Sequence, residues 1–535
     1  MLIRLLILLL AAPALAFAGA PSAESAYRPP LAKSAYEAEL HPIPQTVLRQ
    51  ILAHWRETRV FRDFEGVNDL LKTAPPDGVP GVLYIGEHMP VDLAPEDLFY
   101  DHFVDQGGAH GFLAAVQSAD AEGLRLEVDL SLLGPGNELW LIDPHEPRAF
   151  GPYTETPPGA GPVWLPVTEG DTAVLYVRAQ TADTPLVWVR ELSHIYRSTE
   201  DVFKVLDCHV NVACDTRSGV EDLASAVGRV VISSDGRTGL CSGALVNNPN
   251  SPGFDPLFLT ANHCVGSAAQ ARSTEVIWDY RAGSCGSDRA PSLSSLPRSR
   301  GSRLLSSSAT LDASLMLLDN VPVGTHGRTY AGWDTRTPTI GEAVFNLHHS
   351  SGSHMRISYG TVTAINQRAS LGGFSADYRN QIRVGYTEGV TEGGASGSGL
   401  FYDDGEYKLM GLLSNGPVHS CDSNNNWDRF ASFRHFYEEI KVYLTSEDGV
   451  PDDPGGPSCP AGEAFKNDPE MLEKLRELRD NGLLSSHFGQ AAANAYYRAA
   501  PYLAPMVRAS DMAAAALRGA LRAAASASSP LLPAG

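Results

Sequence analysis

Residues 391–399 read TEGGASGSG, with a serine at position 396 set among glycines and an alanine. Alone, such a stretch is typical of a flexible turn, but glycine also provides the permissive backbone that a nucleophilic serine needs. Amide hydrolysis requires backbone amides aimed at the substrate's carbonyl oxygen, and each such donor stabilises the transition state by roughly 2.7–4 kcal/mol. Ser396 is therefore a candidate nucleophile, and the amides of Gly394 and Ser396 are a candidate oxyanion hole.

Two further stretches supply the partners that a nucleophilic serine requires. A neighbouring imidazole takes the serine's proton, and a carboxylate fixes the tautomer of the imidazole. FLTANHC (258–264) ends an apolar run with His263, and TLDASLMLLD (310–319) holds Asp312 where the next run begins. Each residue alone is more often structural. Together with the serine they predict a triad of base, orienting carboxylate and nucleophile.

The composition narrows the class of protein. The chain has 535 residues, of which 43% are hydrophobic and 19% charged, with 50 glycines and 37 prolines. This predicts three or four globular, loop-rich units and excludes collagen, coiled coil and wholesale disorder. The formal charge of -21 repels phosphate backbones and anionic membrane surfaces. We therefore expect no nucleic-acid partner.

The N-terminus, MLIRLLILLLAAPALAFAGA (1–20), has the pattern of a secretory signal peptide. A basic Arg4 precedes an apolar run, and small residues follow in an A-x-A pattern. The run is shorter than the roughly 20 apolar residues of a membrane anchor. We expect a secreted, extracellular protein without stable membrane insertion, in a compartment where disulfides persist.

Residues 21–204 contain no cysteine and combine one helical pattern with several strand patterns. The segment PQTVLRQILAHWRETR (44–59) has helical periodicity. LRLEVDL (124–130) alternates like a half-buried strand with Arg125, Glu127 and Asp129 on its polar side. Further apolar runs at 139–143, 163–167 and 172–179, separated by turns, predict a β-sandwich.

The remainder divides into a β-rich segment, a linker and a helical tail. Short apolar strands dominate residues 205–445 before FRHFYEEIKVYL (433–444), a helical pattern, so the fold class is mainly β. SEDGVPDDPGGPS lies within the linker at 446–458. Residues 459–535 are expected to form a small helical unit.

Several motifs in the β-rich segment resemble the chymotrypsin-fold serine endopeptidases, and within them the bacterial lysyl endopeptidases. They are CHVNVAC (208–214), LCSGALVNN (240–248), FLTANHC, YAGWD (330–334), GVTEGGASGSG (389–399) and GLLSNGPVHSC (411–421). The resemblance implies a trypsin-like pair of six-stranded β-barrels with the active site in the cleft between them. It implies His263 as general base, Asp312 as its orienting partner and Ser396 as nucleophile, acting on protein or peptide substrates without a cofactor or metal.

The seven cysteines are unevenly placed, because five of them lie between positions 208 and 285. Counting alone leaves 15 pairings open for six cysteines. The resemblance implies three bridges, Cys208 to Cys421, Cys214 to Cys285 and Cys241 to Cys264. The last would clasp the loop that carries the histidine, which stabilises by about 3 kcal/mol in the chain-entropy model. Cys459 is left over.

The residues that select the substrate depart from the relatives' pattern. Trypsin selects basic side chains with a carboxylate six residues before the nucleophile, where this chain has Val390. Lysyl endopeptidases use an aspartate shortly before a Tyr-Gly-Arg segment, and Asn425 falls about at that place. Asp422 or Asp428 would be substitutes, although an exposed Asn/Asp-rich loop is by default a plain turn. A preference for basic residues stays open.

The segment from Leu412 to Gly416 is expected to form an extended edge that pairs with a substrate backbone as an added strand. Ser414, Asn415 and Gly416 are therefore candidate substrate-binding residues. The relatives tend to have a histidine where Ser414 stands, so the packing of His263 is expected to differ.

Activation is expected to differ from that of trypsin-type zymogens. There, an aspartate directly before the nucleophile captures the freed N-terminal amine, and Ala395 cannot make that ion pair. The simplest hypothesis is that residues 21–204 are a propeptide that assists folding or covers the cleft, cut off near Lys204. The competing interpretation is a permanent accessory β-sandwich domain.

Two other functions are weighed against an active peptidase. A catalytically inactive binding protein on the same fold is the alternative, but such proteins usually lack a triad residue, and all three are present here. Metal-dependent hydrolysis lacks support, because the chain has no HExxH motif and the adjacent His348 and His349 have no carboxylate or cysteine at ligand spacing. Those two histidines are expected to be structural.

Overall fold

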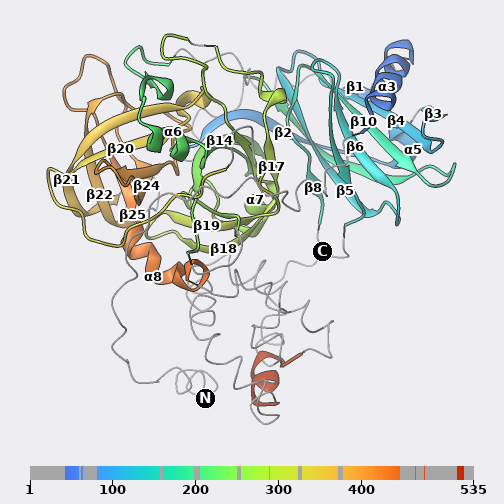
Figure 1. Cartoon of the computed structure of the whole chain (residues 1–535). Helices are drawn as coiled ribbons and strands as arrows, with labels where there is room; N and C mark the ends of the chain where they lie inside the picture. Colours follow the sequence, from blue (N-terminus) through green and yellow to red (C-terminus); the bar gives the residue numbers. More distant parts are fainter. Residues whose placement is uncertain are drawn as a thin grey trace.

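The computed structural model describes residues 43–58, 62–63, 81–99, 101–156, 161–197, 205–249, 255–287, 289–322, 328–370, 377–445, 464–465, 471, 475 and 515–522. Two β-rich units lie side by side in Figure 1. The predicted signal peptide and linker, Cys459, and most of the predicted helical tail lie outside the described residues. Within the described ranges, no helix is long and apolar enough to cross a membrane.

The N-terminal unit is a sandwich of two sheets. Its elements are α3 (Gln45–Thr58), β1 (Arg62–Asp63), β2 (Leu83–Leu93), α5 (Pro95–Leu98), β3 (Asp101–Val104), β4 (His110–Gln117), β5 (Gly123–Leu132), β6 (Glu138–Asp143), β7 (Arg148–Tyr153), β8 (Val163–Trp164), β9 (Thr168–Glu169), β10 (Thr172–Ala179) and β11 (Leu186–Ile195). One sheet has the order β1-β4-β10-β6-β7, with β3 beside β4. The other contains β2, β11, β5, β8 and β9. The predicted sandwich is confirmed.

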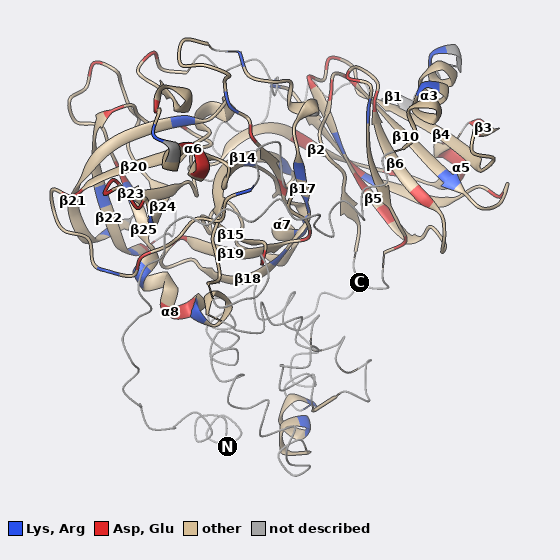
Figure 2. Cartoon of the chain, viewed as in Figure 1, with Lys and Arg blue, Asp and Glu red and all other residues tan. Residues whose placement is uncertain are grey.

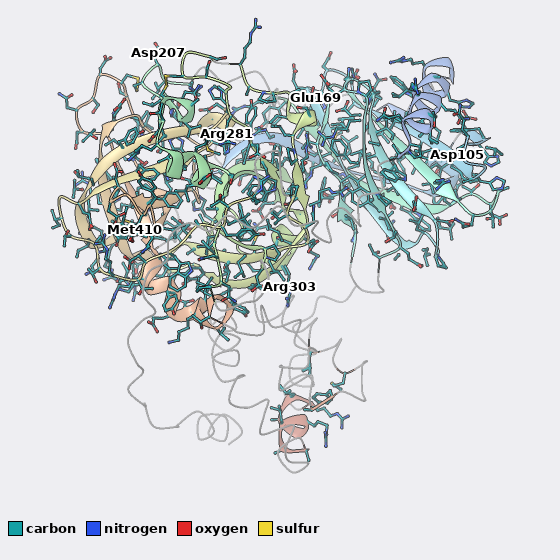
Figure 3. All side chains as sticks on the ribbon, in the orientation of Figure 1. Asp105, Glu169, Asp207, Arg281, Arg303 and Met410 are labelled. Atoms are coloured by element: carbon teal, nitrogen blue, oxygen red, sulfur yellow. A yellow bond between two sulfur atoms is a disulfide. The ribbon has the colours of Figure 1, made fainter. Side chains whose placement is uncertain are left out.

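The two-residue period of a strand explains why both faces of the first sheet are buried. On β4, Phe112 and Ala114 face the core between the sheets, whereas Leu113 and Ala115 belong to the cluster beneath α3. Helix α3 contributes Ile51 to that second cluster, as its helical periodicity predicts. Figure 3 shows side chains crowding the interior of this unit and of its neighbour.

A first barrel follows the N-terminal unit. Its segment comprises β12 (Val210–Asn211), the 3-10 helix η1 (Val212–Cys214), α6 (Ser218–Ala224), β13 (Val227–Ser234), β14 (Arg237–Leu245), β15 (Leu257–Thr260), α7 (Ala268–Ser273), β16 (Glu275–Trp278), η2 (Leu293–Ser295), β17 (Arg298–Arg300), β18 (Ser302–Ser308) and β19 (Ala313–Leu318). The strands form a row β17-β16-β13-β14-β15-β19-β18. Only Gly301 separates β17 from β18, at a φ of 79°, so the two ends of the row meet at one bend.

The second barrel is closed. Its elements are β20 (Ala343–His348), η3 (Ser350–Gly352), β21 (Arg356–Ser370), β22 (Asp377–Glu388), β23 (Gly399–Tyr402), β24 (Leu409–Asn415), β25 (Trp427–Ser432) and α8 (Phe433–Leu444). The order β21-β20-β23-β24-β25-β22 returns to β21 through the β21–β22 pairing. The mainly β, trypsin-like fold class is confirmed.

A shared sheet joins the two units. Strand β2 of the N-terminal unit pairs antiparallel with β14 of the first barrel, with Leu83 opposite Leu240 and Glu87 opposite Arg237. Glu87 also forms an ion pair with Arg237 at 3.1 Å. Acidic and basic residues are interspersed over both units in Figure 2.

One expectation for β5 was wrong. The alternating pattern predicts a solvent-facing Arg125, but that residue is only 1% exposed. Its Nε donates to Leu165 O at 2.9 Å and its Nη1 donates to Ser233 Oγ at 3.0 Å. Ser233 lies on β13 of the first barrel, so the neighbouring unit, and not water, covers β5 at Arg125.

Candidate active site

His263 follows strand β15 and is held through both its backbone and its ring. Its backbone N–H donates to Asp312 Oδ1 at 2.9 Å, and its Nδ1 lies 2.8 Å from Asp312 Oδ2. Because a carboxylate only accepts hydrogen bonds, Nδ1 carries the proton in this contact. Nε2 is buried and makes no hydrogen bond to any described residue, which leaves its lone pair available to take a proton.

Asp312 is fully buried and occupies a left-handed backbone conformation, with a φ of 65°. Its backbone N–H donates to Ser308 O at 2.7 Å. A buried carboxylate is tolerated only when it is hydrogen-bonded, and Ser414 Oγ supplies a further donor to Asp312 Oδ2 at 2.5 Å. Ser414 thus contacts the carboxylate directly.

The loop that carries Ser396 is pinned to the first barrel by Ser242 on β14. Ser242 N–H donates to Ser396 O at 2.8 Å, and Ser242 Oγ donates to Gly394 O at 2.9 Å. Gly397 has a φ of 80°, and a Cβ there would lie 2.2 Å from Thr260 Oγ1. The glycine-rich sequence is therefore required by close packing as well as by backbone conformation.

Ser396 and His263 converge on one point, and Gly81 of the N-terminal unit lies there. An ideal Cβ built on Gly81 would be 2.5 Å from Ser396 Oγ and 2.9 Å from His263 Nε2. Gly394 N–H donates to the carbonyl oxygen of Gly81 at 3.1 Å. A backbone carbonyl thus already occupies the position that the sequence assigns to a substrate's carbonyl.

Asp428 on β25 lies between the segment before the nucleophile and the expected edge strand. Tyr386 OH and Thr391 Oγ1 donate to Asp428 Oδ2 at 2.6 and 2.5 Å. A Cβ on Gly416 would lie 1.7 Å from Asp428 Oδ1, so only glycine fits there. Asp428 is 2% exposed.

The other candidate pocket residues occupy different surroundings. Val390 is buried, at 2% exposure. Asn415 ends β24, and its Nδ2 donates to Ser414 Oγ at 3.1 Å. Asn425 is exposed in a turn, where its N–H donates to Ser423 Oγ at 3.1 Å. The structure therefore brings Asp428, rather than Asn425, against Gly416. The predicted edge is wrong for Leu412 and Leu413, because β24 lies between β23 and β25 and is paired on both sides there.

His419 is the immediate partner of Asp428. Its Nε2 lies 3.2 Å from Asp428 Oδ1, and its Nδ1 donates to Thr391 O at 2.6 Å. Burial alone would lower the pKa of His419, but the hydrogen bond and charge of Asp428, with the carbonyls of Thr391 and Trp427, raise that pKa to about 9. His419 is consequently protonated at neutral pH and pairs with Asp428 as a cation.

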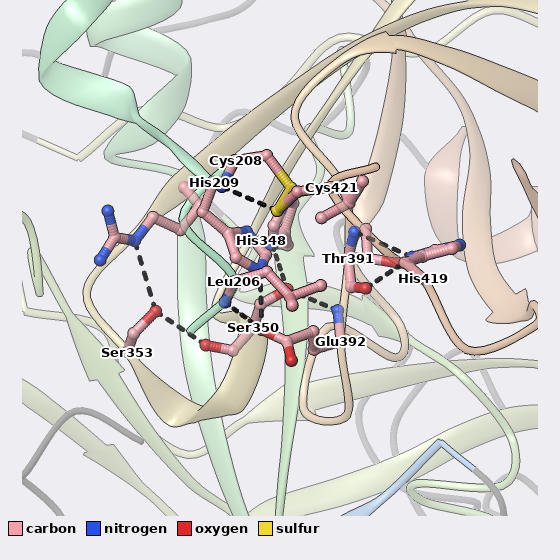
Figure 4. Close-up of polar contacts among 12 residues, drawn as sticks. Leu206, Cys208, His209, His348, Ser350, Ser353, Thr391, Glu392, His419 and Cys421 are labelled. Atoms are coloured by element: carbon pink, nitrogen blue, oxygen red, sulfur yellow. Dashed lines mark hydrogen bonds and ion pairs between the residues drawn. A yellow bond between two sulfur atoms is a disulfide. The ribbon is translucent and has the colours of Figure 1, made fainter. Parts of the chain in front are cut away.

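Glu392 links the nucleophile loop to the start of the β-rich segment (Figure 4). Its Oε2 accepts from Leu206 N–H at 3.2 Å and lies 2.8 Å from His209 Nε2. Its backbone N–H donates to Ser350 Oγ at 2.9 Å. Burial raises the pKa of Glu392, but these donors outweigh it and the net shift is downward.

The structure pairs the cysteines as the resemblance implies. The bridges are Cys208–Cys421, Cys214–Cys285 and Cys241–Cys264, with Cα–Cα distances of 5.5, 4.3 and 6.4 Å. The third joins β14 to the residue that follows His263, so it restrains the backbone directly after the imidazole.

His348 and His349 are buried among serines. The two ring nitrogens of His348 contact the hydroxyls of Ser358 and Ser350 at 2.9 and 2.8 Å, and His349 Nδ1 donates to Ser353 O at 3.0 Å. Burial lowers the pKa of both, that of His349 to about 3. No three His, Cys, Asp or Glu residues in the described ranges are grouped to hold a metal ion.

Four residues at this site were not predicted from the sequence. Ser242, next to Cys241, and His419, within GLLSNGPVHSC, lie in motifs that were recognised for other reasons. Glu392 lies in the nucleophile loop itself. Gly81 has no local signal, because its role depends on the pairing of two strands about 150 residues apart.

Comparisons with known proteins identify sequence relatives and structural neighbours of the chain. The profile of the lysyl endopeptidase C-terminal domain matches residues 204–431. A lysyl endopeptidase of Pseudomonas aeruginosa is 30% identical over 362 residues, covering 64% of this chain and 74% of the relative. Among solved structures, an HtrA-type protease AlgW with a tripeptide has 15% identity and a TM-score of 0.30, covering 42% of this chain and 62% of its own. An M. tuberculosis protease in its active form has 12% identity and a TM-score of 0.32, covering 45% and 91%.

Proposed function

The chain belongs to the lysyl endopeptidase family and is a serine endopeptidase, and we propose that His263, Asp312 and Ser396 carry its reaction. The observation that supports this most is the arrangement of the imidazole. Asp312 holds Nδ1 at 2.8 Å, while Nε2 is left without a hydrogen bond among described residues and faces the same point as Ser396 Oγ.

In the proposed reaction, Ser396 Oγ attacks the scissile carbonyl carbon while His263 Nε2 takes the hydroxyl proton. The negative charge that develops on the carbonyl oxygen is stabilised by the N–H groups of Gly394 and Ser396. His263 then gives the proton to the leaving amine, and an acyl-enzyme forms on the serine. Water, activated by the same imidazole, hydrolyses the acyl-enzyme.

An ester substrate with a coloured leaving group tests the covalent step. The processed protein is expected to release a burst of product equal to its own molar amount before the slower steady state. Ser396→Ala should abolish the burst and the steady state together. A burst that survives in Ser396→Ala would contradict the proposal, and binding of peptides without any turnover would favour the catalytically inactive alternative.

A preference for basic side chains is the finer part of the proposal. Asp428 supports it, because its carboxylate lies against Gly416 and Thr391, on the two segments expected to enclose the substrate side chain. His419 opposes it, because its cation already partners that carboxylate at 3.2 Å. We therefore propose a weaker preference for lysine and arginine than an unpaired carboxylate would give.

We also propose that residues 1–20 direct secretion and that residues 21–204 act as a propeptide removed near Lys204. The antiparallel pairing of β2 with β14 supports a unit that folds together with the peptidase. N-terminal sequencing of fully active secreted enzyme tests this. Finding residues 21–204 still covalently attached would instead favour the permanent accessory domain.

A further inference from the structure

Strand β2 does more than join two sheets, because the residues at its start lie on the proposed nucleophile. Gly81 has its Cα next to both Ser396 Oγ and His263 Nε2, since a Cβ there would lie 2.5 and 2.9 Å from them. Because the Cα lies one bond from that Cβ position, Gly81 lies directly beside the proposed nucleophile and base. A substrate carbonyl cannot reach Ser396 while Gly81 is in place.

The carbonyl oxygen of Gly81 also accepts the hydrogen bond of a backbone N–H group that a substrate carbonyl needs. Gly394 N–H donates to Gly81 O at 3.1 Å. Gly394 is itself fixed in a left-handed conformation, with a φ of 94° and with His349 O only 3.0 Å from where its Cβ would be. The donor therefore cannot turn away to serve a second carbonyl.

The residues after Gly81 follow the path of a leaving group. Leu83 stands opposite Leu240 in the antiparallel ladder between β2 and β14. Val82 packs against β14, because a Cβ on Gly239 would lie 2.5 Å from Val82 Cγ1. In amide hydrolysis the residues that follow the bound carbonyl belong to the leaving amine, so the edge of β14 is the surface that receives them as an added strand.

We propose that Gly81–Leu83 is a built-in inhibitor, which binds the leaving-group side of the catalytic centre on the edge of β14. This rests on the proposed function and adds the segment, the surface and the mode of inhibition. The occupant of the surface is an extended, apolar stretch of the same chain that begins with glycine.

The same geometry explains why the segment resists cleavage. Gly81 has a φ of 98°, whereas a substrate that pairs as an added strand has the negative φ of extended backbone. The Cβ position of Gly81 points at Ser396 Oγ, so a residue with a side chain does not fit in this conformation. Glycine also offers no side chain to the surroundings of Asp428, so the contacts that select a substrate are not made.

Cleavage near Lys204 does not release this segment by itself. Strand β2 stays in the ladder with β14, and contacts across the two units persist, including Arg125 Nη1 to Ser233 Oγ at 3.0 Å. Full activity therefore requires a second event, the dissociation or further digestion of the N-terminal unit.

The test uses the full chain carrying Lys204→Gln, which slows the proposed cut, and a fluorophosphonate probe read in the full-length gel band. Gly81→Val introduces a side chain that the site cannot hold and a residue that avoids positive φ. The matched control is Gly108→Val, since Gly108 also has a positive φ, of 82°, but has nothing within 4 Å of its Cβ position.

The unmodified and Gly108→Val chains should label slowly, and Gly81→Val should label about 10²-fold faster, near the rate of processed enzyme, because a tethered competitor acts at high effective concentration. Two results would overturn the proposal that Gly81–Leu83 is an inhibitor. One is equal labelling rates for full-length and processed chains, and the other is no faster labelling of Gly81→Val in a chain with native near-UV circular dichroism. Failure of every form to label, including processed enzyme, would instead remove the proposed function.

Discussion

Ser414 Oγ donates a 2.5 Å hydrogen bond to Asp312 Oδ2, the same oxygen that lies 2.8 Å from His263 Nδ1. The carboxylate is fully buried, so each of these donors counts for more than it would in water. Ser414 thus supplies a hydroxyl that orients the acid.

Ser414→Ala removes that hydroxyl and leaves the carboxylate one donor short. Hydrogen bonds to charged groups contribute about 1.5–3 kcal/mol, so we expect kcat to fall by about tenfold or more with little change in KM. Steady-state kinetics on one peptide measure this. Ser302→Ala is the control, because Ser302 is also buried and donates to Ala271 O at 2.7 Å; an equal fall in kcat there would mean that the effect is general.

The Asp428–His419 pair predicts how selectivity responds to substitution. His419→Gln removes the cation that neutralises the carboxylate, so the ratio of kcat/KM for arginine over alanine substrates should rise at pH 7. Asp428→Asn should lower it by about tenfold or more, the usual effect of losing a charge-assisted contact. Unchanged ratios in both variants would show that Asp428 does not contact the substrate side chain.

The same pair predicts a pH dependence. The pKa of His419 is raised from its ordinary value to about 9, so the pairing stabilises the folded state fully below the unfolded pKa, and this stabilisation is lost as pH rises through about 9. Preference for arginine should increase over the same range, because Asp428 loses its cationic partner. A pH profile of the arginine-to-alanine ratio checks this, and His419→Gln should flatten it.

Glu392 predicts a link between the nucleophile loop and the segment after the proposed cut. Glu392→Gln keeps the shape but removes the charge that pairs with His209 Nε2 at 2.8 Å. We expect a loss of about 1–3 kcal/mol in the free energy of unfolding and a lower kcat, because residue 392 begins the loop that holds Gly394. Denaturant titration and kinetics measure the two effects.

The pH dependence of the Glu392 effect has a definite sign. The pKa of Glu392 is lowered in the folded state, so its contribution is present at neutral pH and is lost as the pH falls through that lowered value. The difference between wild type and Glu392→Gln should therefore shrink in acid. Glu388→Gln is the control, since Glu388 is an exposed residue at the end of β22.

The Cys241–Cys264 bridge predicts a combined loss of stability and catalysis. Replacing both cysteines by alanine should cost about 3 kcal/mol of stability in the chain-entropy model and lower kcat, since Cys264 follows His263. The Cys214–Cys285 bridge closes a longer loop, with a sequence separation of 71, and its removal should cost about 4 kcal/mol while leaving kcat unchanged. If kcat fell only in the variant that lacks the Cys214–Cys285 bridge, this would contradict the prediction that the Cys241–Cys264 bridge positions His263.

Local pattern was sufficient for much of the fold. Helix α8 has the predicted bounds of 433–444, and β10 spans the predicted run of 172–179, because burial of one helical face or of a whole strand leaves a clear period in the residues. The residues proposed as base, acid and nucleophile could be recognised because their motifs are long. In the structure these three residues lie in one place.

The contacts between units could not be predicted in this way. Arg125 reads as a solvent-facing residue of β5, and only the neighbouring Ser233 shows why it is buried. Gly81 belongs to no recognisable motif. It lies beside Ser396 because of the register in which β2 pairs with β14. Asn425 falls about at the place that the resemblance assigns to an aspartate, but the buried carboxylate beside Gly416 and Thr391 belongs to Asp428.

The most direct test is to label the processed enzyme with a fluorophosphonate and to map the modified residue by mass spectrometry. The account predicts one modified site, Ser396, with labelling lost in His263→Ala and slowed in Asp312→Asn, because the serine depends on the imidazole that Asp312 orients. Modification at any other serine, or peptide cleavage that survives Ser396→Ala, would contradict it.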